Sequence, residues 1–265
     1  MLRKRIKFGI MTLIFSLSLT SVGGIVSAKN VEDVDNDFIP EGFTVTKAYD
    51  ETDLDYNVSE QKAARFFDNS NEKALLLSTD GETESSLETE ILKNETHKIR
   101  DIKNLETGEE RTQYKTDVSL RAFKGDNKWD PSGGVNLSIT IYSSTYYNDM
   151  YTGMDKAYVR WDKEDSTISS MTADSTIIQV GPGKNGAVTN QNYTNEGNHP
   201  GNPWNIISGN TYLFEVQNYN WEPILTSGLG TQIGVKFTTQ LKRGSTTWKY
   251  TFGVMVLGTF PQWPE

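Results

Sequence analysis

The sequence predicts an all-β protein: an antiparallel β-sandwich, immunoglobulin-like or jelly-roll-like, preceded by an acidic, partly disordered N-terminal arm. Apolar and polar residues alternate over many short segments, which is typical of strands that bury one face. Clusters of Gly, Pro and Asn separate these segments, and no long segment has the 3.6-residue period of a helix. Short strands joined by turns favour two sheets packed around one core.

The first 28 residues have the pattern of a secretion signal. A basic stretch that ends at Lys7 precedes the apolar run Phe8–Leu19, and Val26-Ser27-Ala28 supplies the small residues of a cleavage site. The apolar run is shorter than the ~20 residues that a membrane-spanning helix needs. We therefore expect a secreted, extracellular protein.

Residues 29–95 are expected to form the acidic arm, with a possible short helix at 59–67 capped by Ser59. Residues 31–117 contain 23 acidic and 10 basic residues, and the whole chain has a formal net charge of −9. This acidity argues against a nucleic-acid partner, because phosphate contacts need clustered Lys and Arg.

Residues 96–265 are expected to form the sandwich domain. Its strands are predicted where the alternation is clearest, and turn residues bound each of them. The expected strands are 97–103, 110–123, 135–142, 156–162, 175–180, 187–193 and 211–217, followed by a hairpin within 231–257.

The final hairpin carries the strongest pattern. If Arg243 and Gly244 form its two-residue loop, all its apolar side chains share one face. This register predicts that Phe237 lies opposite Tyr250 and that Val235 lies opposite Phe252.

The sequence gives little support for catalysis. It contains no cysteine and only two histidines, His97 and His199, and neither lies near a nucleophile motif. We expect no metal ion, no cofactor and no catalytic residues, although Glu215 and Glu222 leave a carboxylate-dependent glycoside hydrolase as an alternative. A secreted chain without cysteine favours a bacterial source, and the basic stretch and long signal favour a Gram-positive one.

Aromatic residues in loops are the most informative functional feature. Several tryptophans stand beside proline outside the predicted strands, accompanied by Tyr and Asn. Such residues can stack on sugar rings and bond their hydroxyl groups. The candidate ligand-binding residues are Trp129, Trp204, Trp221, Tyr219, Asn218 and Asn220.

These residues predict a non-enzymatic protein that binds an extracellular polysaccharide or another cell-wall polymer. Two alternatives stay open. The loop rings could instead plug the ends of the sandwich, since each buries about 150–250 Å². The protein could also be a membrane-active toxin or bacteriocin that inserts an amphipathic hairpin, with the acidic arm as a removable segment.

Overall fold

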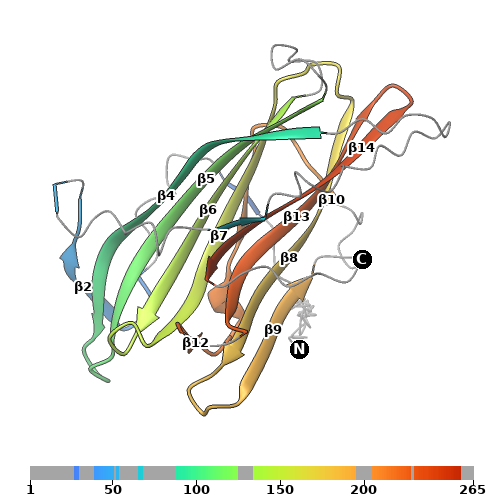
Figure 1. The fold of residues 1–265 in the computed structure, drawn as a ribbon. Coiled ribbons are helices and arrows are strands. Elements are labelled where there is room, and N and C mark those ends of the chain that lie inside the picture. Colours follow the sequence, from blue (N-terminus) through green and yellow to red (C-terminus); the bar gives the residue numbers. More distant parts are fainter. Residues whose placement is uncertain are drawn as a thin grey trace, which may run out of the picture.

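The computed structural model describes residues 27–29, 39–50, 52–53, 65–67, 87–124, 134–194, 204–227 and 230–257. Strands dominate these residues, and two antiparallel sheets pack face to face (Figure 1). No α-helix occurs within the described ranges, which contain one short 3₁₀ helix, η2 (Val216–Tyr219). The predicted all-β sandwich is confirmed.

The first sheet has eight strands and the second has six. In spatial order the first contains β1 (Ser27–Lys29), β11 (Thr211–Phe214), β7 (Tyr151–Lys163), β6 (Val135–Tyr146), β5 (Glu110–Lys124), β4 (Leu87–Asn104) and β2 (Phe43–Ala48), and β12 (Ile224–Leu225) also pairs with β7. The second contains β10 (Trp204–Asn205), β8 (Ser170–Pro182), β13 (Gln232–Arg243), β14 (Thr246–Leu257) and β3 (Arg65–Phe67), and β9 (Val188–Thr194) also pairs with β8.

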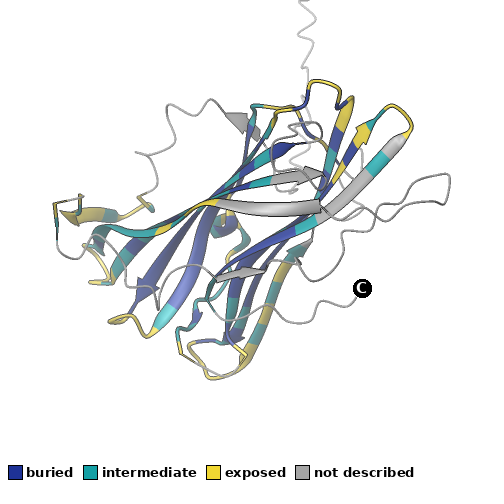
Figure 2. Ribbon diagram, turned by 45° about the horizontal axis from the view of Figure 1, so that its top comes forward, coloured by how far each residue is buried: buried dark blue, intermediate teal, exposed yellow. Residues whose placement is uncertain are grey.

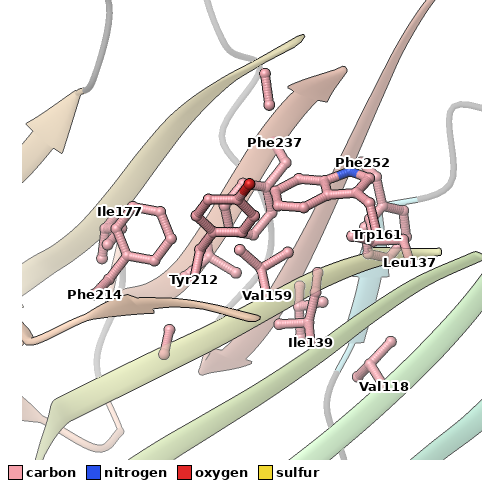
Figure 3. Close-up of a cluster of buried hydrophobic side chains, with 14 of the residues drawn as sticks. Val118, Leu137, Ile139, Val159, Trp161, Ile177, Tyr212, Phe214, Phe237 and Phe252 are labelled. Carbon is pink, nitrogen blue, oxygen red and sulfur yellow. The ribbon is translucent and has the colours of Figure 1, made fainter. Parts of the chain in front are cut away.

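The core lies between the sheets and centres on Trp161 of β7, which is fully buried (Figure 3). Its ring meets Phe237 of the opposite sheet edge to face, with 5.5 Å between the ring centroids. Its indole N–H donates to the Thr239 hydroxyl at 3.0 Å. A buried indole with a satisfied donor joins the two sheets through both apolar packing and a hydrogen bond.

The final hairpin forms as predicted, but its register differs. Phe237 lies opposite Phe252 and Val235 opposite Val254, so the expected Phe237–Tyr250 pair is wrong. The loop residues are Gly244 and Ser245, one position later than expected, and Gly244 has φ of +58° at the first loop position. Two-residue hairpin loops require positive φ there, which glycine adopts without steric cost. The shift of two residues does not change which face a side chain lies on, and Val235, Phe237, Phe252 and Val254 are buried as predicted.

A β-bulge on β7 places Asp155 as an extra residue where the pairing with β6 shifts. The Asp155 carboxylate is 4% exposed and accepts a hydrogen bond from the Ser144 hydroxyl at 2.6 Å. Burial raises its pKa to about 6, although Ser144, Arg111, Lys156 and the Gln113 side chain act in the opposite direction.

The range expected to form the arm contributes strands to both sheets. β2 pairs with β4 at the edge of the first sheet, and β3 pairs with β14 at the edge of the second. β3 also corrects the helix expected at 59–67, because residues 65–67 are a strand and residues 59–64 lie outside the described ranges. Pairing with an open sheet edge satisfies backbone groups that the edge would otherwise leave unpaired.

Among the described residues, no helix combines the length and the apolar character that crossing a bilayer requires.

Candidate functional site

Trp204 belongs to the core. It lies on β10, is 7% exposed, and packs edge to face on Trp161 at 5.5 Å and on Tyr212 at 4.6 Å between centroids. This placement agrees with the alternative in which loop rings plug the sandwich. We therefore leave Trp204 out of the candidate site. Trp129 lies outside the described residues.

Tyr219 and Trp221 meet a third ring, from β9. Tyr193 and Tyr219 stack with 5.0 Å between centroids and 17° between ring planes, and Tyr219 and Trp221 are 5.4 Å apart. All three rings are partly buried and pack against the edge of the core. We call this set of Tyr193, Tyr219 and Trp221 the aromatic surface.

A tight local structure presents Tyr219 and Trp221 next to each other. The buried side chain of Val216 anchors η2, and the Asn218 N–H donates to the Glu215 carbonyl at 3.1 Å. Asn220 then takes a left-handed conformation with φ of +53°, which asparagine tolerates better than most residues. The side chains of Asn218 and Asn220 are exposed beside the rings.

Two glutamines fix the backbone immediately after Trp221. The Gln191 amide accepts a hydrogen bond from the Glu222 N–H at 2.5 Å and donates to the Glu222 carbonyl at 2.8 Å. The Gln179 amide donates to the same carbonyl at 2.8 Å. These bonds fix the backbone immediately after Trp221, and none of them involves the Trp221 ring.

The contacts of Glu222 and Glu215 test the glycoside hydrolase alternative. Its carboxylate accepts a hydrogen bond from the Lys184 N–H at 2.8 Å and lies against Gly183, where an added Cβ would come within 2.7 Å of it. Glu215 is exposed and accepts from the Asn218 amide at 3.2 Å. Glu222 therefore serves the turn between β8 and β9, which gives no support to a catalytic role.

The two tyrosines of the aromatic surface stay protonated over a wide pH range. Burial raises the pKa of Tyr219 to about 12, with further contributions from Tyr193 and Glu215, and burial also raises the pKa of Tyr193. Both phenol groups are therefore hydrogen-bond donors at neutral pH. Stacked rings with attached donors match a ligand that has an apolar face and a rim of hydroxyl groups.

A hollow lies between the β4–β5 hairpin and the β6–β7 turn. It has a volume of about 510 Å³, and its lining includes Asp101, Lys103, Glu110 and Asp149. Several of these groups already bond to one another or to neighbours, such as Lys103 to Glu110 at 2.7 Å and Asp101 to the Tyr49 hydroxyl at 2.6 Å. Internal pairing leaves fewer groups to receive a ligand, so we prefer the aromatic surface.

Sequence reasoning missed Tyr193, Gln179 and Gln191. Each lies on β8 or β9, and a ring stack with Tyr219 or a hydrogen bond to Glu222 joins it to a distant part of the chain. Within the described residues, no group of three or more His, Cys, Asp or Glu side chains is arranged to hold a metal ion. Comparison of the chain with family models, curated proteins and solved structures finds no match.

Proposed function

We propose that the protein is a secreted, non-enzymatic β-sandwich that binds an extracellular or cell-envelope polysaccharide through its aromatic surface. The observation that carries the proposal is the contiguous set of Tyr193, Tyr219 and Trp221, partly exposed and fixed against the core. A rigid aromatic face matches the apolar face of a sugar ring at low cost in conformational entropy.

Polar groups around the rings support the same ligand class. Asn218 and Asn220 are exposed on either side of Tyr219 in the chain. Amide side chains both donate and accept, as sugar hydroxyl groups do. A few placed polar groups around an apolar contact fix a ligand's orientation and specificity.

The N-terminal sequence supports the extracellular location. The basic stretch, apolar run and small residues before Lys29 are the features of a secretion signal. The lack of cysteine favours release from a bacterium, and the basic, long signal favours a Gram-positive one, whose wall polysaccharide would then be the nearest ligand.

The membrane-insertion alternative has less support from the final hairpin. β13 pairs with β8 on one side and with β14 on the other along most of its length. Its apolar residues Val235 and Phe237 are buried in the core. Insertion of this hairpin would break both ladders and open the core, so we assign it a structural role.

The proposal is tested by binding to insoluble peptidoglycan and polysaccharide, with Tyr219→Ala and Trp221→Ala as the variants. We expect the wild-type chain to sediment with a polymer and each variant to bind at least about tenfold more weakly, because each loses a stacking face. Tyr219→Phe keeps the ring and loses one donor, so it should retain more binding than Tyr219→Ala.

Tyr147→Ala is the matched control, since Tyr147 is exposed and does not belong to the aromatic surface. Melting temperatures show whether the Trp221 ring serves mainly to bind sugar or to plug the end of the sandwich. Unchanged polymer binding together with a large fall in melting temperature would show that the ring is a plug and would refute the glycan site.

A further inference from the structure

Three turns at one end of the sandwich carry exposed apolar side chains. They are the β4–β5 turn with Leu105, the β6–β7 turn with Tyr147 and Met150, and the β8–β9 turn, after which β9 starts at Val188. We call these four residues the tip surface. They are not part of the aromatic surface, so an inference about them stands independently of the glycan site.

The structure ties the three turns together. Arg111, at the start of β5, lies opposite Tyr146, at the end of β6, so the first two turns lie at the same end of the first sheet. The Lys184 ammonium donates to the Tyr147 hydroxyl at 3.2 Å, which connects the third turn to the second. Figure 1 shows the three turns together, far from the β13–β14 turn.

The exposed apolar side chains of the tip surface gather at one end of the molecule. Relative exposures are 71% for Leu105, 52% for Tyr147, 55% for Met150 and 74% for Val188. Four of the eight exposed large hydrophobic residues in the described ranges therefore lie on these turns or, for Val188, directly after one. Figure 2 shows the turns at this end coloured as exposed. Single exposed apolar residues need no explanation, but a group at one end of a molecule indicates an interaction surface.

Local backbone structure holds two of the turns in shape. The Asn104 side chain accepts hydrogen bonds from the N–H groups of Glu106 and Thr107, both at 2.9 Å, so the turn presents Leu105 outward. Tyr147, Asn148 and Asp149 all have positive φ, which Asn and Asp tolerate but which a bulky residue such as Tyr147 rarely adopts. Strained conformations of this kind cluster at functional positions.

We propose that the tip surface docks on the interfacial region of a phospholipid bilayer with uncharged, zwitterionic headgroups. The apolar side chains project from separate turns, which suits insertion between lipids. Tyr147 combines an apolar ring with a hydroxyl bonded to Lys184, and Tyr and Lys side chains of this kind settle at the boundary between hydrocarbon and water.

The charges of the turns select the lipid class. Residues 103–111, 147–150 and 183–188 contain four carboxylates and three cationic side chains. A surface this close to neutral gains no electrostatic attraction from anionic lipid, which favours polybasic segments. Docking therefore depends on buried apolar area and changes little with salt.

The test uses the absence of cysteine, which makes any introduced thiol unique. An environment-sensitive fluorophore is attached to Leu105→Cys, Met150→Cys or Val188→Cys and titrated with vesicles of phosphatidylcholine. Ile207→Cys is the control, because Ile207 is 63% exposed and neighbours the far end of β7. We expect a blue shift at the tip positions and none at Ile207.

Sedimentation with the same vesicles gives the strength of docking. Leu105→Ser and Met150→Ser should each weaken partitioning about tenfold, Ile207→Ser should leave it unchanged, and polysaccharide binding should persist in all three. Binding that requires phosphatidylserine, equal label shifts at both ends of the molecule, or no binding to phosphatidylcholine would each overturn the proposal.

Discussion

Asp155 is the extra residue of a β-bulge, and the bulge buries its carboxylate at a position that regular strand alternation would not predict. The bulge opposite Tyr142 adds Asp155 to β7, and the side chain is buried with Ser144 as its hydrogen-bond donor. Burial disfavours the charged form and raises the pKa from 3.8 to about 6. The folded chain therefore binds this proton more tightly than the unfolded chain does.

This shift predicts a pH dependence of stability. The contribution of Asp155 is fully present below about pH 4 and is lost as the pH rises through about 6, because ionisation is harder in the folded state. Relative to the wild type, Asp155→Asn should gain on the order of 3 kcal/mol of unfolding free energy between these values. Urea unfolding at several pH values gives this difference.

The difference in unfolding free energy between Asp155→Asn and the wild type contains no contribution from other carboxylates, because both proteins share them. Asp165, for example, has a lowered pKa although burial opposes the shift, because Thr167 and Arg243 contact it. Its contribution has the opposite pH dependence and is common to both proteins. A constant stability difference across this pH range would contradict the assignment to Asp155.

The aromatic surface shows which site residues the sequence predicts. Tyr219 and Trp221 are close along the chain, so their proximity needs only the short η2 turn. Tyr193 stacks on Tyr219 although the two residues are 26 positions apart, and the alternation that predicts β9 does not indicate which distant ring its tyrosine meets. Trp204 precedes a loop but belongs to the core, because β10 pairs with β8 and carries the ring inward.

At the scale of elements, alternation predicts which face of a strand is buried more reliably than it predicts the partner strand's register. In the final hairpin, any even-length loop places the same side chains on the core side, so the apolar pattern does not decide between registers. The conformation of Gly244 decides it instead. β4 was expected at 97–103 and extends over 87–104, because two bulges interrupt its alternation.

The observed register predicts which cysteine pairs can form a disulfide. The hydroxyls of Thr238 and Thr251 are 3.0 Å apart across β13 and β14. Thr238→Cys with Thr251→Cys should therefore oxidise readily, since a disulfide needs Cβ atoms within about 4.5 Å. Lys236→Cys with Thr251→Cys, which the sequence-based register places opposite, should not. Thiol titration after mild oxidation distinguishes the two, and preferential oxidation of the second pair would contradict the observed register.

At the scale of the whole molecule, one core cluster spans both sheets. Leu137 of β6 and Phe237 of β13 both belong to it, and Trp161 contacts Phe237 directly. Sheets that share one core are expected to unfold together, because neither buries its apolar face alone. Strands from the N-terminal range at the sheet edges extend this unit beyond the predicted boundary at residue 96.

Because the two sheets share one core, a cavity made in one sheet should lower the stability of both. Leu137→Ala should cost about 2–5 kcal/mol and Phe237→Ala about 3–5 kcal/mol of unfolding free energy, because each leaves a cavity in the shared core. Native-state hydrogen exchange should then speed up by similar factors in β6 and in β13 for either variant. Thr251→Ala, on a partly exposed position of β14, should change stability by no more than about 0.5 kcal/mol. Faster exchange confined to the substituted sheet would mean that the sheets unfold as separate units, which their shared burial of Trp161 argues against.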